Sequence, residues 1–391
     1  MLRTARGGLL LVATLLLPGP ARAQDKPPVP VPAPSPAPPP APSPVPPPAA
    51  PPAAAPAPDA DLPPEREVNR DARTDPRNQK PDAFPVIRRA EYLPALAARK
   101  MDPGEWVIGA VVGKSALAFP INILNRSEIL VDEVDGVPFL VTWCPLCRTG
   151  TVHVRTLDGQ VLDFGHSGLL YRSAFLLYEQ KSKSLLHNAT GTFLAGPLRG
   201  KRLETIPSRF VQWEVWRKSR PDTKVLAKDP LDLDQTVDGY DRRNRGLKLK
   251  FGLGIEAGGA ERLYELDQLD VLPLVQETVG GVPLVVVFHP GTQTATAFER
   301  ALDGKVLDLR RGEDGADGLP RLEETGEDRS VFQAVTGEGL SGPLKGKFLV
   351  PVPGCFWEVY AWTAHHPRGT MFRASVPPPQ DLPDIPEGED K

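Results

Sequence analysis

The sequence has almost no net charge and only one long apolar run, at its start. Its 46 basic and 49 acidic residues give a net charge of −3 over 391 residues. A protein that binds nucleic acid through its phosphates needs a basic surface, so we exclude nucleic acid as a partner. After residue 23, no apolar stretch approaches the roughly 20 residues that a membrane helix needs, so we expect no transmembrane span.

Two signatures of enzyme sites are also missing. The chain contains no nucleophile elbow and no recognisable Ser–His–Asp order, which argues against hydrolase chemistry. Residues Gly113–Ser115 lack the upstream glycine spacing of a phosphate-binding P-loop and fall in an expected hairpin turn. Only three cysteines are present, and two of them, Cys144 and Cys147, stand close together.

What the chain has in excess is proline, concentrated near its start. Residues 1–23 combine two arginines, a short apolar core and an Ala-Arg-Ala cleavage site, which predicts a secretory signal peptide. Residues 24–80 are rich in proline and then in charge, so we expect a disordered tether there. A disordered tail is expected at 377–391. The protein should therefore be exported, periplasmic or extracellular, and its cysteines should meet an oxidising compartment.

The body of the chain repeats itself. Glu133–Val141 resembles Thr278–Val286, and Asp158–Asp163 resembles Asp303–Asp308, each at a separation of 145 residues. A Gly-Pro-Leu-x-Gly-Lys motif recurs further along at a separation of 146. Ordered matches of this kind predict two copies of one unit. We place the first copy at 81–228, a linker at 229–270 and a degenerate second copy at 271–376.

Each copy is expected to be rich in β-structure. Short apolar, β-branched runs between Gly and Asp turns predict strands, and a Trp-bearing stretch late in each copy predicts a helix, which Ser208 would cap in the first copy. A further short helix is expected at Glu91–Lys100. The predicted fold class is α+β, mainly β: two tandem copies, each ending in a helix, packed as a pseudo-two-fold pair.

The segment Val137–Cys147 carries the candidate chemistry. An apolar strand ends in Cys144 and Cys147, with two residues between them. Such a pair can close a small disulfide ring or place two thiolates on one metal ion. A turn and a strand are expected after the pair, so the helix N-terminus that lowers a thiol pKa in thioredoxin-like proteins is not expected. Redox activity, metal binding and a structural disulfide all remain open.

The second copy helps to separate these alternatives. His289 and Thr292 stand at the positions of Cys144 and Cys147, so the repeated unit does not need a disulfide there to fold. This favours a site carried by the first copy alone, with Cys144 as the attacking thiol and Cys147 as the resolving thiol. Cys355, at the start of the second copy's helix, is expected to be a buried free thiol.

A metal site would need ligands besides the two sulfurs. A closed zinc site takes four ligands, whereas Cu(I) accepts fewer sulfur ligands, so copper or zinc is the cofactor to consider. Cys144, Cys147 and His166 are the candidate ligand set. His153 and His187 are further histidines on neighbouring strands.

Several motifs follow one another in the chain: Ala118–Pro120, Ile123-Leu124, Val141–Cys147, Ser167–Tyr171 and Gly196–Leu198. Together they resemble the bacterial family called domain of unknown function 3179, some members of which are described as possible selenoproteins. The resemblance covers about Asp102 to Phe372 and implies family membership without implying a particular reaction. Ser127 stands where the family usually has the His of a His-Glu pair, so a role of that His with the thiols would be lost here.

Three functions compete at this point. The first is an exported protein with a thiol redox site at Cys144 and Cys147, which faces a groove between the copies and acts on a redox partner protein. As an enzyme it would be thiol–disulfide oxidoreductase-like. The second is a copper- or zinc-binding module that uses the same thiols. The third is a non-catalytic surface protein that binds a partner.

Overall fold

A computed structural model describes residues 62–74, 80–145, 147–227, 250–326 and 329–375. Strands predominate over helices in these ranges, as expected. None of the helices there is long and apolar enough to cross a membrane. The expected signal peptide, the proline-rich part of the tether, residues 229–249 of the linker and the tail lie outside the described residues, so these expectations stay predictions.

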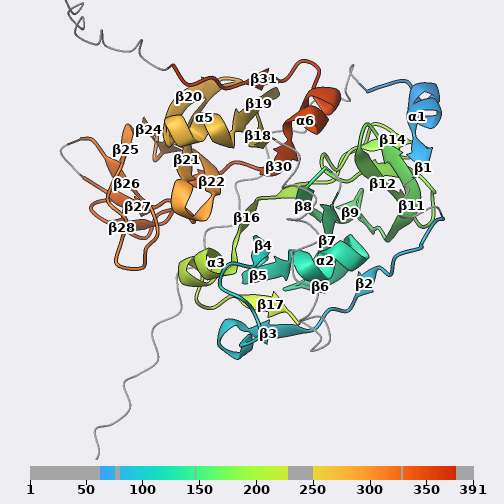
Figure 1. Cartoon of the computed structure of the whole chain (residues 1–391), viewed down its shortest axis with the longest axis horizontal. Helices are drawn as coiled ribbons and strands as arrows, with labels where there is room; N and C mark the ends of the chain where they lie inside the picture. The colour runs from blue at the N-terminus through green and yellow to red at the C-terminus, as the bar shows by residue number, and fades with distance from the viewer. Residues whose placement is uncertain (1–61, 75–79, 146, 228–249, 327–328, 376–391) are drawn as a thin grey trace, which may run out of the picture. The chain divides into compact units, whose positions relative to one another are not determined.

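The first unit contains three sheets (Figure 1). The first has the strand order β16-β4-β5-β17-β3, and its central hairpin forms at the expected place. Its members are β3 (Tyr92–Pro94), β4 (Trp106–Val112), β5 (Ser115–Pro120), β16 (Ser208–Gln212) and β17 (Lys224–Leu226).

Most strands of the second and third sheets follow helix α2 (Ile121–Ser127) in the chain, but one edge strand of each precedes it. The second has the order β15-β8-β7-β6-β2, formed by β2 (Ile87–Arg88), β6 (Ile129–Val134), β7 (Val137–Cys144), β8 (Thr149–Val154) and β15 (Thr205–Ile206). The third has the order β1-β11-β12-β13-β14, formed by β1 (Arg73–Thr74), β11 (Phe164–Tyr171), β12 (Ala174–Glu179), β13 (Leu185–His187) and β14 (Phe193–Ala195). A short ribbon pairs β9 (Thr156–Leu157) with β10 (Gln160–Val161).

The second unit repeats this plan without the added edge strands. Its sheets have the orders β30-β18-β19-β31, β20-β21-β22-β29 and β25-β26-β27-β28, with β23 pairing β24. The strands are β18 (Phe251–Ala257), β19 (Ala260–Glu265), β20 (Leu274–Val279), β21 (Val282–His289), β22 (Thr294–Glu299), β23 (Ala301–Leu302), β24 (Lys305–Val306), β25 (Leu309–Arg311), β26 (Arg321–Glu324), β27 (Val331–Gln333), β28 (Gly339–Ser341), β29 (Val350–Pro351), β30 (Gly354–Glu358) and β31 (Thr370–Met371).

The pairing of strands also repeats. In each unit, the strand before the last helix returns antiparallel to the first strand of the hairpin: β16 pairs β4, and β30 pairs β18. The strand after that helix then pairs parallel with the second strand of the hairpin: β17 with β5, and β31 with β19. The helices concerned are α3 (Trp213–Ser219) and α6 (Val359–His365), and α5 (Leu266–Val271) occupies the place of α2. The tandem organisation therefore holds at the level of strand pairing.

Each unit fixes its last helix with the same pair of residues. A Cβ on Gly109 would lie 2.4 Å from the ring of Trp216, and a Cβ on Gly254 would lie 2.4 Å from the ring of Trp362. Only glycine leaves room for an indole this close to the strand backbone. The tryptophans therefore dock each helix on its sheet.

The linker predicted at 229–270 is too long. Residues 251–265 form the hairpin of β18 and β19, and α5 begins at Leu266, so the second unit starts about 20 residues before the predicted boundary at 271. The motif matches begin further along the chain, so they did not mark this hairpin. It closes through backbone pairing with β30, which a linear comparison cannot show.

Part of the predicted tether is also folded. Helix α1 (Glu65–Asp71) and strand β1 lie within the segment 24–80, and β1 pairs with β11. Val68 is fully buried beside Tyr171 and Leu194. The segment is mostly charged, so the single apolar residue that anchors the helix, Val68, did not indicate a folded element. The segment belongs to the third sheet of the first unit.

Two helices begin elsewhere than predicted. Ser208 starts strand β16 and does not cap a helix; α3 begins five residues later, at Trp213. The stretch Glu91–Lys100 forms strand β3 and a single 3-10 turn, Ala95–Ala97. Pro94, inside this stretch, breaks the helical pattern that its alanines favour.

Candidate functional site

The cysteine pair lies at the end of a central strand. Strand β7 is buried from Phe139 onward, and it ends at Cys144, while β8 begins at Thr149. Both Cys144 and Cys147 have no exposed surface. The turn between them brings the amide nitrogen of Cys147 to 3.5 Å from Cys144 Sγ, to which it donates. All three cysteines are free thiols in this structure.

A short chain of hydrogen bonds leads away from Cys147. Its sulfur lies 2.9 Å from Thr149 Oγ1, and Asn188 Nδ2 donates to the same hydroxyl oxygen at 2.8 Å. Since Asn188 occupies an acceptor site of Thr149, the hydroxyl proton can be donated to the sulfur. Asn188 is itself fully buried.

The second unit shows which of these contacts are structural. Thr151 Oγ1 donates to the carbonyl of Asn188 at 2.7 Å, and Thr296 Oγ1 donates to the carbonyl of Ala334 at the same distance. This bond is common to both units. The Asn188 side chain has no counterpart, because alanine stands at its position in the second unit. The Thr149–Asn188 contact therefore belongs to the cysteine-bearing unit alone.

At the positions of the two cysteines, the second unit has an imidazole and a hydroxyl that bind each other. His289 Nδ1 lies 2.8 Å from Thr292 Oγ1, and His289 Nε2 lies 3.1 Å from Asp314. The turn after β21 is thus held by hydrogen bonds in place of the sulfurs.

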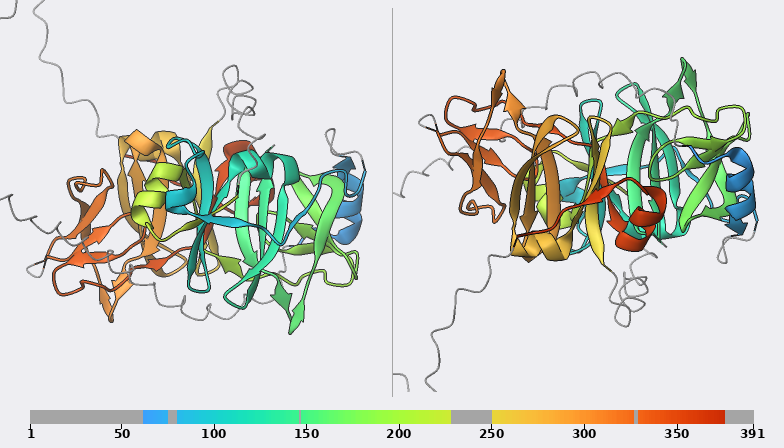
Figure 2. Two further views of the ribbon diagram at one scale, coloured as in Figure 1. Left: turned by 90° about the horizontal axis from the view of Figure 1, so that it is seen from below. Right: turned by 90° about the horizontal axis from the view of Figure 1, so that it is seen from above.

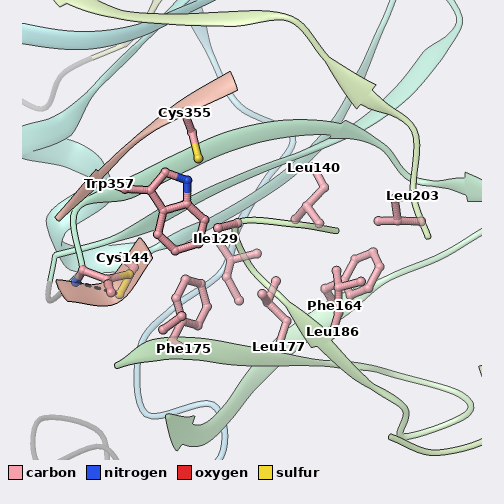
Figure 3. Packing of buried hydrophobic residues seen from close by; sticks show 14 of the residues in the cluster. Ile129, Leu140, Cys144, Phe164, Phe175, Leu177, Leu186, Leu203, Cys355 and Trp357 are labelled. Carbon is pink, nitrogen blue, oxygen red and sulfur yellow. Dashed lines mark hydrogen bonds between the residues drawn. The ribbon is translucent and has the colours of Figure 1, made fainter. Parts of the chain in front are cut away.

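The second unit covers the cysteine pair of the first. Trp357 of β30 and Trp362 of α6 belong to the same apolar cluster as Cys144 and Cys147. The amide of Glu358 donates to the carbonyl of Cys147 at 3.3 Å. Figure 2 shows α6, in red, beside the green strands of the first unit, and Figure 3 shows Trp357 over Cys144. The expectation that the pair faces an open groove is therefore wrong, because indole rings fill the space over the sulfurs.

Cys355 belongs to this cluster but is a poor partner for exchange. Burial raises the pKa of the Cys355 thiol to about 12, so it remains a thiol at neutral pH. In Figure 3 the ring of Trp357 lies between Cys355 and Cys144. The prediction of a buried free thiol is confirmed.

Histidines gather beside the cysteines where the units meet. The rings of His187 and His365 are 4.3 Å apart, and His365 Nε2 donates to the carbonyl of Arg172 at 2.9 Å. Burial lowers the pKa of His365 to about 3, and burial together with His365 holds the pKa of His187 well below its ordinary value. His187 Nε2 is buried and has no hydrogen-bond partner among the described residues. These rings are neutral in the folded protein.

The candidate metal ligands do not come together. His166 Nε2 donates to the carbonyl of Ser127 at 2.8 Å, and its ring packs on Phe175. His153 lies 2.9 Å from Thr151, and burial lowers its pKa to about 4. In the part of the chain that the structure describes, no three His, Cys, Asp or Glu side chains form a group that could hold a metal ion.

Sequence reasoning missed Thr149 and Asn188. Thr149 has a threonine counterpart, Thr294, and so did not stand out. Asn188 differs from its counterpart Ala334, and a comparison of the two copies for polar residues present only in the first would have found it. His365, at the end of α6, was missed as well, because its contact with His187 depends on how the units pack.

Comparison with known proteins gives a family and no function. The chain matches no curated protein and no solved structure. Residues 81–244 and 252–381 match the family described as "Protein of unknown function (DUF3179)". The second match begins at the start of strand β18, in agreement with the unit boundary in the structure. Because the two matches cover most of the chain, the protein belongs to the DUF3179 family.

Proposed function

We propose that this is an exported dithiol protein whose Cys144 and Cys147 cycle between the dithiol and the disulfide against a partner protein. The observation that carries the proposal is the donation of the Cys147 amide to Cys144 Sγ, at 3.5 Å. This contact places a fixed donor on the sulfur of the first cysteine, the one that would attack the partner. Export rests on the predicted signal peptide.

The exchange that this geometry favours has two steps. The Cys144 thiolate attacks one sulfur of the partner's disulfide, the S–S bond breaks, and the partner's other sulfur leaves as a thiolate and is protonated. Cys147 then loses its proton and attacks Cys144 Sγ, which releases the partner as a dithiol. The partner gains two electrons and two protons in total, and the cysteine pair loses them. The reverse sequence would oxidise a partner dithiol.

The hydroxyl of Thr149 assists the second step. It lies 2.9 Å from Cys147 Sγ and can donate to the thiolate as the proton leaves. Asn188 fixes the orientation of that hydroxyl by donating to its oxygen at 2.8 Å. The guanidinium of Arg148 lies over the ring of Phe251, 4.6 Å from the centroid.

The packing of the two units explains why elements of the second unit cover the cysteine pair. We infer that they pack about an approximate two-fold axis, because residues near such an axis meet their own counterparts. Phe210 and Phe356 hold equivalent places on β16 and β30, and their ring centroids are 5.4 Å apart. The Cys pair lies off this axis, under β30 and α6. Exchange with a partner therefore requires these elements to move.

A redox titration tests the proposal. We expect Cys144 and Cys147 to lose their reactivity to an alkylating reagent together as a glutathione buffer becomes more oxidising, in one two-electron transition. Protein is denatured before labelling so that burial does not mask the thiols, and Cys355 serves as the internal control that stays labelled. A pair that stays fully alkylated across the whole range of buffers would refute redox cycling.

Replacing Thr149→Val should shift the dithiol–disulfide equilibrium of Cys144 and Cys147 toward the disulfide. The change removes the hydroxyl beside Cys147 Sγ at nearly constant volume, and a hydrogen bond between neutral groups contributes about 0.5–1.5 kcal/mol, so the equilibrium constant should change by about two- to tenfold. The matched control is Thr294→Val in the second unit, which leaves the sulfurs untouched. Equal titration curves for T149V and T294V would show that the hydroxyl does not act on the pair.

A further inference from the structure

A second site lies where the two units meet, away from the cysteine pair. A small cleft is lined by Arg209 and Phe210 of β16, by Thr296 of β22, and by Cys355 and Phe356 of β30. It has room for an occupant little larger than a water molecule. Cys144 and Cys147 do not line it. The cleft is therefore separate from the cysteine site.

The two strands across the cleft are counterparts, and they place different side chains at one position. Arg209 pairs with Gly109 in the first unit, and Cys355 pairs with Gly254 in the second. One unit thus supplies a cation where the other supplies a thiol. The thiol remains neutral, because burial raises the pKa of Cys355. It provides no negative charge for the guanidinium.

Arg209 is buried, and its Nε has no acceptor among the described residues. Its exposed fraction is 8%, and its guanidinium donates to the carbonyl of Ser208 at 3.1 Å. No carboxylate of the described residues raises its pKa or forms an ion pair with it. Its other neighbour is the face of the Phe298 ring, at 5.1 Å. A guanidinium has five N–H donors, and leaving them unpaired in a buried place is costly.

A second buried arginine adds to the same positive field. Arg220 has an exposed fraction of 5%, its Nε also lacks an acceptor among the described residues, and it lies close enough to act on Arg209 electrostatically. Burial lowers the pKa of Arg209 to about 10, so its charge is still present at neutral pH. Glu338 and Asp222 act on Arg220 through charge, and neither forms a salt bridge with it among the described residues. No described carboxylate acts on Arg209 in this way, so its buried charge calls for a counter-ion.

We propose that this cleft binds one small monovalent inorganic anion of about the size of chloride, held by the guanidinium of Arg209. The hydroxyl of Thr296 donates to Ala334, so it orients the wall and is not the main donor. The anion joins β16 of one unit to β22 and β30 of the other. Its binding therefore stabilises the packing of the units.

Thermal unfolding in two salts tests the site, with chloride itself as the probe. Chloride fits the cleft and gluconate does not. At equal ionic strength we expect the melting temperature to be higher in sodium chloride by about 2–4 °C, as for a ligand present at several times its dissociation constant. Arg209→Gln should abolish this difference. The control Arg99→Gln removes an exposed arginine elsewhere and should retain it.

A second measurement uses the wild-type protein alone, so it does not depend on whether a variant folds. Crystals of the wild-type protein soaked in bromide should give an anomalous peak beside the Arg209 guanidinium. A water molecule at this place with no anomalous signal would overturn the proposal. Equal melting temperatures of the wild-type protein in the two salts, or an unchanged difference in R209Q, would overturn it as well.

Discussion

Lowering the pH from 7 to 5 should destabilise the protein by several kcal/mol. The reason is that His153 and His187, which are buried, and His365, which is partly buried, are held as neutral rings. Burial lowers the pKa of His153 to about 4 and of His365 to about 3, while His187 is held well below its ordinary value. At pH 5 the unfolded chain therefore binds a proton at each of these histidines, and the folded chain does not.

The direction and size of the change in the free energy of unfolding follow from this difference in bound protons. A group whose pKa is lower in the folded state contributes stability above its unfolded pKa, near 6.5, and that stability is lost as the pH falls toward the folded value. Each of these histidines should lower the free energy of unfolding by about 2 kcal/mol between pH 7 and pH 5. Three together could remove a large share of the stability of an ordinary domain, which is about 5–15 kcal/mol.

Denaturant unfolding at a series of pH values measures the effect. The free energy of unfolding should fall steadily below about pH 6.5, and His153→Gln should flatten the slope by the share of one histidine. The mutation also removes the ring contact with Thr151, so the slope and not the absolute stability is the readout. A free energy of unfolding that is constant between pH 7 and pH 5 would contradict the assignment.

The repeat and its strands could be predicted from sequence because their signals are local. The hairpin of β4 and β5 and strand β7 formed where the apolar runs and glycine turns predicted them. Shared motifs also have a structural explanation in both units. The amide of Leu198 donates to Ser184 Oγ at 2.9 Å, and the amide of Leu344 donates to Ser330 Oγ at 3.2 Å. The Gly-Pro-Leu motif therefore serves the fold and carries no chemistry of its own.

What the sequence could not show is how the units pack. The residues that cover Cys144 come from β30 and α6, more than 200 positions away in the chain. Local periodicity contains no information on such contacts, so an open groove was predicted where Trp357 and Trp362 lie. The buried charge of Arg209 was missed for the same reason. Its strand was predicted to be a helix, and the opposing wall belongs to the other unit.

The second large expected effect is on the labelling rate of the cysteines that β30 and α6 cover. Trp362→Ala should increase the labelling rate of Cys144 and Cys147 in the native protein by about 100-fold or more. Trp362 packs in the cluster that contains both sulfurs, and truncating a buried tryptophan costs about 3–5 kcal/mol. If α6 opens as a local unit, that cost lowers the free energy of opening, and each 1.4 kcal/mol changes the open population tenfold.

The matched control is Trp216→Ala in the first unit. Trp216 packs on Gly109 as Trp362 packs on Gly254, and it is equally buried, but its cluster contains no cysteine. Both variants should lose similar global stability, while only W362A should expose the thiols. Equal labelling rates in the two variants would mean that the sulfurs are reached only by global unfolding. In that case β30 and α6 would be a fixed part of the core, and a partner protein could not reach the pair in the folded state.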